Sequence, residues 1–168
     1  MLQSGMPTHN KNETFLSQFG KSADAKEFFS PIPEGYQHGK TKFVVVLGTV
    51  MSGLGKGIFS SSLAKLLQDK GLSVTPVKLE GYLNIDSGTL NPFRHGEVFV
   101  LDDGTETDMD LGTYERILDQ NLSRANFTTA GQIYTEILTR ERAGGYLGRD
   151  VQMIPHVTGE VKRRLRQL

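Results

Sequence analysis

A glycine-rich stretch over residues 48–57 has the composition of a phosphate-binding loop. It reads Gly-Thr-Val-Met-Ser-Gly-Leu-Gly-Lys-Gly, and Lys56 is its one charged residue. Backbone N–H groups of such a turn, together with the N-terminus of a following helix, form a cradle for phosphate oxygens. The loop departs from the common G-x-x-x-x-G-K-[ST] pattern, because Gly57 replaces the hydroxyl that normally contacts Mg²⁺ and Gly48 lies too far from Gly55. The alternative, an ordinary glycine-rich turn with a solvated lysine, is disfavoured by the predicted strand before the loop and helix after it.

A run of carboxylates follows later in the chain, with no basic residue among them: Asp102, Asp103, Glu106, Asp108 and Asp110. Mg²⁺ takes oxygen ligands and often uses one or two carboxylates together with substrate phosphates. Asp108 and Asp110 would face the same way if this stretch is extended. They would then supply the metal contact that the loop lacks. A solvated acidic loop is the alternative interpretation.

Lys78 lies at the carboxyl end of a strand that is predicted over residues 73–79. Ligands of α/β proteins bind beyond the carboxyl ends of parallel strands, so this lysine is a second candidate for phosphate contact. The alternative is an ordinary surface lysine.

The elements around these residues predict an α/β fold with a parallel sheet flanked by helices. Phe43–Leu47 is a continuous, β-branched run, which is typical of a strand buried on both faces. A helix follows the loop, because the apolar residues between 59 and 67 fall on one face, and Gly71 ends it. Further strands are predicted over residues 73–79, 97–101 and 151–154, and further helices over residues 113–121, 128–142 and 159–168.

Composition limits the class of protein. The chain has 168 residues, 37% of them hydrophobic, which allows one domain with a core. Basic and acidic side chains number 19 each, and the zero net charge argues against nucleic-acid binding through bulk electrostatics. No apolar run reaches the ~18 residues that cross a bilayer, which argues against a membrane protein. The lack of cysteine excludes disulfides and thiolate catalysis and fits a cytoplasmic location.

The polar composition of residues 1–40 predicts a poorly ordered N-terminal extension, with one helical turn around residues 24–29. The folded part is expected over residues 41–168. Its last predicted helix runs to residue 168 without a cap or a polar tail, so we expect the fold to continue in a longer parent sequence.

An ordered series of motifs resembles the N-terminal amidoligase (synthetase) domain of CTP synthase, from about residue 43 to the end of the chain. The motifs are Ser52-Gly-Leu-Gly-Lys-Gly57, Val77-Lys-Leu79, Tyr82-Leu-Asn84, Asp86, Gly88-Thr89, His95-Gly-Glu-Val-Phe-Val100, Asp103-Gly104, Glu106-Thr107, Asp108-Met-Asp110-Leu-Gly112, Tyr114-Glu-Arg116, Asn126-Phe-Thr-Thr129 and Tyr146-Leu-Gly148.

The resemblance implies a P-loop NTPase-like α/β fold and the ATP-dependent amination of UTP to CTP with ammonia. It implies that ATP phosphates bind to Gly53, Leu54, Gly55, Lys56, Gly57 and Ile58. Lys56 and Lys78 would be the catalytic lysines, which stabilise the transferring phosphoryl group. Asp110 would bind Mg²⁺ and lie against ATP, with Asp108 as a nearby metal ligand. Ser52 would lie on the UTP/CTP side of the pocket.

Several positions depart from the family pattern and predict a divergent member: Gly53, Glu80, Gly81, Ser87 and Thr113 stand where the family usually has Ser, Asp, Pro, Pro and His. The resemblance also places the second Mg²⁺ carboxylate, the UTP-triphosphate segment and the glutaminase domain that releases ammonia beyond residue 168. The sequence is therefore expected to hold an incomplete half-domain that is inactive alone. The family's tetramers allow self-association here.

Two other classes of function remain open from the sequence. The first is a deviant P-loop ATPase switch of the chromosome-partitioning type, which shares the strand–loop–lysine opening. Such proteins usually have a second lysine early in the loop, where this chain has Thr49, Val50 and Met51. The second is a non-catalytic interaction module derived from either family.

Overall fold

The computed structural model describes residues 32–48 and 54–168 and confirms the predicted α/β class. Its central element is a parallel pair of strands, β1 (Lys78–Glu80) and β4 (Phe127–Thr129), with Leu79 opposite Thr128. A separate antiparallel pair consists of β2 (Phe99–Val100) and β3 (Glu106–Thr107). The two pairs do not join into one sheet within the described residues.

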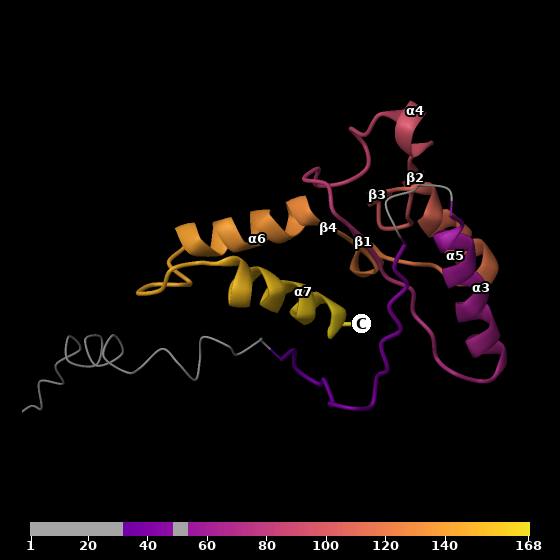
Figure 1. The fold of residues 1–168 in the computed structure, drawn as a ribbon, viewed down its shortest axis with the longest axis horizontal. Helices are drawn as coiled ribbons and strands as arrows, with labels where there is room; N and C mark the ends of the chain where they lie inside the picture. Colours follow the sequence, from indigo (N-terminus) through magenta and orange to yellow (C-terminus); the bar gives the residue numbers. More distant parts are fainter. Residues whose placement is uncertain (1–31, 49–53) are drawn as a thin grey trace, which may run out of the picture.

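Helices lie on both sides of the parallel pair (Figure 1). One side holds α3 and α5, which pack against each other, and the other holds α6 and α7. The helices are α3 (Lys56–Asp69), α4 (Pro92–His95), α5 (Met109–Leu118), α6 (Ala130–Arg142) and α7 (Thr158–Leu165), with short turns η1 (Arg124–Asn126) and η2 (Met153–Val157). None of the helices in the described part of the chain has the length and apolar character needed to cross a membrane.

The core is small and forms around the start of β4 and the buried face of α5. Phe127 and Leu111 are fully buried there. The cluster comprises Leu101, Leu111, Tyr114, Leu122 and Phe127, with Tyr82 and Phe99 packed against it. This core fixes α5, and thus the acidic residues at its start, relative to the parallel strands.

The first turn of α6 packs directly on the backbone of the segment that follows β1. A Cβ atom at Gly131 would lie 2.6 Å from the carbonyl carbon of Leu83 and 2.8 Å from the carbonyl oxygen of Asn84. The Gly131 N–H donates to the carbonyl of Tyr82 at 3.2 Å. Only glycine leaves room for this contact.

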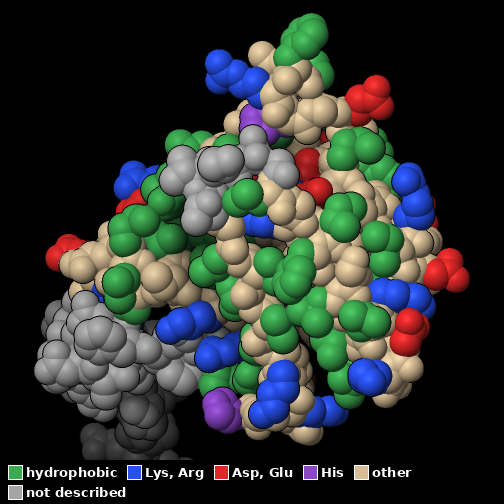
Figure 2. All heavy atoms as spheres, turned by 45° about the vertical axis from the view of Figure 1, so that its right-hand side comes forward, with side chains coloured by type: hydrophobic (Ala, Val, Ile, Leu, Met, Phe, Trp, Pro, Cys, Tyr) green, Lys and Arg blue, Asp and Glu red, His purple; other side chains and the backbone are tan. Residues whose placement is uncertain are grey.

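The predicted strand over Phe43–Leu47 is wrong. The segment is not a strand, and Val44 and Val45 are 65% and 74% exposed. A strand requires a hydrogen-bonded neighbour as well as β-branched side chains, and none of the strands in 32–48 and 54–168 pairs with this segment. Figure 2 shows many hydrophobic side chains at the surface of the face turned toward the viewer.

Two other strand predictions are corrected. The strand predicted over residues 73–79 begins only at Lys78, after Pro76, which cannot donate to a ladder and whose carbonyl accepts from the Asn126 side chain at 2.8 Å. Residues 151–154 do not form a strand, because the chain turns at η2, where the Gln152 N–H donates to His156 Nδ1 at 3.0 Å.

The helix predictions agree with α3, α5, α6 and α7 to within a few residues at their ends. The predicted strand over residues 97–101 is present as the shorter β2. The helical turn predicted around residues 24–29 lies outside the described residues.

Candidate functional site

The Lys78 ammonium lies among three carboxylates from two different elements. Its Nζ contacts one oxygen each of Asp108 and Asp110 and lies 3.1 Å from Glu80 Oε1. The Lys78 side chain is 18% exposed and that of Asp108 14%, so this contact is largely shielded from water. We refer to Lys78, Glu80, Asp108 and Asp110 as the lysine cluster. The sequence singled out Lys78 and the pair Asp108 and Asp110 separately, and the structure brings them together.

Each element of the cluster places its side chains for a local reason. Lys78 and Glu80 are two residues apart on β1, so they point to the same face. Asp108 is the N-cap of α5, and its carboxylate accepts from the Asp110 N–H at 3.1 Å. Asp108 and Asp110 were predicted to face the same way on an extended stretch. The stretch is not extended, because α5 begins at Met109. Both side chains nevertheless reach Lys78.

Asp110 also lies against the first turn of α3, where the glycine-rich loop becomes helix. A Cβ atom at Gly57 would lie 2.6 Å from Asp110 Oδ1. The N-cap of α3 is Gly55, whose φ of 77° is in the left-handed region that glycine adopts at no steric cost. No side-chain cap from the described residues covers the start of α3, and Asp110 brings negative charge to this positive helix end.

Lys56 begins α3 and folds back over the preceding segment. A Cβ atom at Gly48 would lie 2.8 Å from Lys56 Nζ, so the ammonium rests on the Gly48 backbone. Leu54 and Ile58 are exposed on either side of it. Ser52 and Gly53, predicted for the pyrimidine and phosphate contacts, lie outside the described residues.

The charges in the lysine cluster shift the pKa of its members. Burial works against the charge of Lys78, but hydrogen bonds to Asp108 and Asp110 and the attraction of the carboxylates outweigh it, so its pKa lies above its ordinary value. Burial raises the pKa of Glu80, and the positive charge of Lys78 offsets this only in part. Lys78 is therefore a permanent cation near neutral pH.

The donor atoms in the cluster are of the kind that Mg²⁺ takes. Asp108 and Asp110 direct carboxylate oxygens at one point of positive charge, the Lys78 ammonium. Within the described residues no group of three or more His, Cys, Asp or Glu side chains is arranged to enclose a metal ion. Mg²⁺ often uses one or two carboxylates together with waters and substrate phosphates rather than a closed protein cage, and Asp108 and Asp110 supply such a pair.

Comparison with known proteins identifies the family. A family model described as CTP synthase N-terminus matches residues 42–168. The chain belongs to this family. A CTP synthase of Pyrobaculum calidifontis is 60% identical over 124 residues, which cover 74% of this chain and 23% of the relative. CTP synthases of Halobacterium salinarum and Thermosipho africanus are 56% and 58% identical over 127 residues, which cover 76% of this chain and 23% and 24% of the relatives.

The chain spans less than a quarter of the length of these CTP synthases. Membership of the CTP synthase family decides against the partitioning-type ATPase that shares the strand–loop–lysine opening.

One member of the lysine cluster was missed by sequence reasoning. Glu80 stood out only as a departure from the CTP synthase pattern, yet it joins Asp108 and Asp110 at Lys78. Its position two residues after Lys78 was the available signal, since alternate residues of a strand share a face.

Ser87, another departure from the family pattern, is buried and shares a 3.0 Å hydrogen bond with the Tyr82 hydroxyl. Thr113 donates to the Met109 carbonyl within α5.

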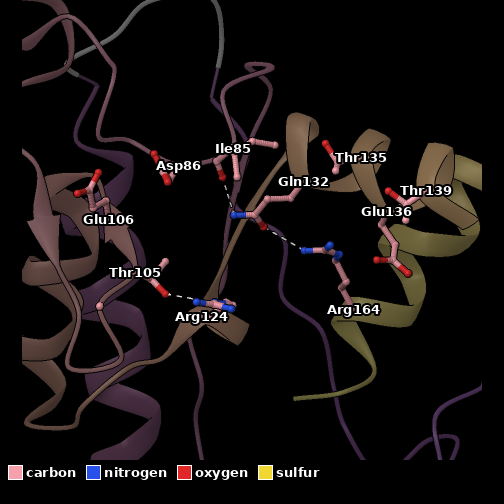
Figure 3. A pocket seen from close by; sticks show the side chains of 11 residues that line it. Ile85, Asp86, Thr105, Glu106, Arg124, Gln132, Thr135, Glu136, Thr139 and Arg164 are labelled. Carbon is pink, nitrogen blue, oxygen red and sulfur yellow. Dashed lines mark hydrogen bonds between the residues drawn. The ribbon is translucent and has the colours of Figure 1, made fainter.

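A separate cavity of about 410 Å³ lies between α6, α7 and the residues next to β3 (Figure 3). Within it Gln132 donates to the Ile85 carbonyl at 2.8 Å and accepts from Arg164 at 3.0 Å. Its charged lining is mixed and comprises Arg124, Arg164, Asp86, Glu106 and Glu136. Among the described residues, none of the site residues that the CTP synthase resemblance predicted lines it.

Proposed function

We propose that this chain carries the ATP- and Mg²⁺-binding part of an enzyme that aminates UTP to CTP. In that reaction ATP phosphorylates the 4-oxygen of the uracil ring, and ammonia then displaces the phosphate, so that UTP, ATP and ammonia give CTP, ADP and phosphate. The observation that carries the proposal is the convergence of Lys78, Asp108 and Asp110 beside the start of α3.

The residues divide the work of phosphoryl transfer. Gly53 to Ile58 hold the ATP phosphates through loop and helix N–H groups, and Lys56 adds a cation that can move from the Gly48 backbone onto them. Lys78 stabilises the transferring phosphoryl group, since it is the more shielded of the two lysines. Ser52 contacts the pyrimidine nucleotide. Such transfer needs positioning and charge neutralisation more than covalent chemistry.

Asp110 and Asp108 are proposed as the metal contacts of this chain. Mg²⁺, when bound, neutralises charge on the nucleotide phosphates. Asp110 holds it next to the loop, because its carboxylate already lies against Gly57. Asp108 fixes the start of α5 as its N-cap and thereby keeps Asp110 in place.

The rest of the enzyme is needed for the whole reaction. Since the chain covers less than a quarter of its CTP synthase relatives, we propose that the remaining metal and UTP contacts, and the release of ammonia from glutamine, belong to segments that this chain does not contain. We also propose that the chain self-associates, because the family that it resembles forms tetramers.

Calorimetric titration of the full chain with ATP and Mg²⁺ tests the proposal. We expect Lys56→Ala to weaken ATP binding by about 10- to 100-fold, because a hydrogen bond to a charged group contributes about 1.5–3 kcal/mol. Lys70→Ala is the matched control, since Lys70 is exposed at the opposite end of the same helix. Equal ATP affinity in Lys56→Ala and wild type would contradict the assignment of the loop.

A further inference from the structure

The carboxylate of Asp110 occupies the space that a side chain at residue 57 would fill. A Cβ atom at Gly57 would lie 2.6 Å from Asp110 Oδ1, 2.9 Å from its Cγ and 3.2 Å from its Oδ2. All three distances are shorter than an ordinary contact between carbon and these atoms. The whole carboxylate therefore covers the Gly57 Cα.

The backbone gives no other reason for glycine at this position. Gly57 lies in the first turn of α3, and it is not among the described glycines with positive φ. In a helix, glycine is less favourable than alanine because it loses more conformational entropy on folding. Among the described residues, the Asp110 carboxylate is thus what a side chain at residue 57 would meet.

Both partners are held by other contacts of their own. Asp110 is held through its Oδ2 by Lys78 and through its N–H by the Asp108 cap. On the other side, the Gly57 carbonyl accepts a 2.9 Å hydrogen bond from Ser61, whose side chain is fully buried. The packing of α3 against α5 fixes the two helices together.

We propose that Gly57 is a positioning residue that admits the Asp110 carboxylate to the place where a standard phosphate loop has a hydroxyl. The metal contact of this site is then supplied by α5 and not by α3. This inference rests on the proposed function for its meaning in catalysis, but the coupling between Gly57 and Asp110 can be measured without it.

Gly57→Ser is the most informative variant, because a hydroxyl at residue 57 should change Mg²⁺-dependent ATP binding in opposite directions for the two possible roles of this position. If the loop acts like a standard one, the new hydroxyl adds a metal contact, and ATP binds more tightly with Mg²⁺. If Gly57 makes room for Asp110, the new side chain displaces the carboxylate and the contribution of Mg²⁺ to ATP binding is lost.

The experiment is calorimetric titration of the full chain with ATP, with and without Mg²⁺, for wild type, Gly57→Ala and Gly57→Ser. We expect both variants to reduce Mg²⁺-dependent ATP affinity by ~10- to 100-fold, as loss of a residue that orients a metal ligand commonly does. The metal-free ATP affinity of each variant is its own reference, so the effect on Mg²⁺ is measured as the ratio of the affinities with and without Mg²⁺. Gly81→Ala is the matched control, since a Cβ there meets nothing within 4 Å. Unchanged or tighter Mg²⁺–ATP binding by Gly57→Ser overturns the proposal.

A double-mutant cycle with Asp110→Ala separates this inference from the proposed function. Urea unfolding of wild type, Gly57→Ala, Asp110→Ala and the double variant should show that Gly57→Ala destabilises the chain only while Asp110 is present. If Gly57→Ala fails to fold, the double variant should fold. Additive losses, or failure of both variants to fold, overturn the role of Gly57. Wild type without Mg²⁺-dependent ATP binding but with strong coupling would instead reject the proposed function alone.

Discussion

Replacement of Lys78 by methionine should destabilise the chain, because Lys78 is the shared cation of three carboxylates. Methionine keeps much of the length and apolar character of the lysine stem and removes the charge. Glu80, Asp108 and Asp110 would then repel one another without a counterion. The loss of stability therefore reports the electrostatic role of Lys78 rather than its packing.

The magnitude follows from how far the cluster is shielded. Removing one partner of a fully buried ion pair costs about 3–5 kcal/mol, and a surface pair contributes about 0–1 kcal/mol. The side chains of Lys78, Asp108, Glu80 and Asp110 are 18%, 14%, 24% and 42% exposed, which lies between these limits. We expect Lys78→Met to lower the free energy of unfolding by about 2 kcal/mol near neutral pH.

The loss should depend on pH with a defined sign. The pKa of Lys78 is raised in the folded chain, so its contribution is fully present below its unfolded pKa and is lost only in strong base. In Lys78→Met the carboxylates lack their cation, and burial, which already raises the pKa of Glu80, acts without compensation. Above about pH 4 the folded variant then binds more protons than its unfolded chain, so its free energy of unfolding rises as the pH falls. The difference in free energy of unfolding between wild type and Lys78→Met should therefore shrink as the pH falls toward that value.

Urea unfolding of wild type and Lys78→Met at about pH 8 and about pH 5 measures both effects. Lys65→Met is the matched control, because its ion pair with Asp69 is about half exposed and should contribute less than about 1 kcal/mol at either pH. A loss in Lys78→Met no larger than in the control, or one that grows on acidification, would refute the shared-cation role of Lys78.

Three further outcomes are expected. In calorimetry Asp110→Asn should abolish the Mg²⁺ dependence of ATP binding. Asp103→Asn alters a carboxylate outside the lysine cluster and should leave this dependence intact. Equal behaviour of the two variants would show that the acidic run is a solvated loop. Glu160→Gln should lower the unfolding free energy in urea by about 3 kcal/mol, because its side chain is 1% exposed and accepts from both Arg163 and Arg164. The full chain incubated with ATP, Mg²⁺, UTP and ammonium should form no CTP above a protein-free control on chromatography, because we propose that the remaining metal and UTP contacts belong to segments that this chain does not contain.

Local signals predicted the helices well. The apolar spacing over residues 128–142 corresponds to α6, which begins one residue after its cap, where Thr129 accepts from the Gln132 N–H at 3.1 Å. A capping signal was missed at α5. There Asp108, which caps the helix, was interpreted as part of an extended stretch.

Pairing and contact between distant elements could not be predicted from local patterns. The β-branched run at residues 43–47 has the preference for a strand, but a partner strand is a property of the rest of the fold. A predicted strand end singled out Lys78, which instead begins β1, and an acidic run singled out Asp110. Their contact across 32 positions was not predicted. The closeness of Gly57 to Asp110 is likewise visible only once α3 and α5 are packed.

The glycine at the start of α6 has a consequence for local unfolding. Because Gly131 rests on the backbone of Leu83 and Asn84, and its amide is bonded to the Tyr82 carbonyl, the first turn of α6 and the segment after β1 form one cooperative unit. The amide of Gly131 can exchange its hydrogen with solvent only when both parts separate. That segment begins next to Glu80 of the lysine cluster. Slow hydrogen exchange at Gly131 would thus report on the integrity of the strand that carries Lys78, from a position outside the lysine cluster.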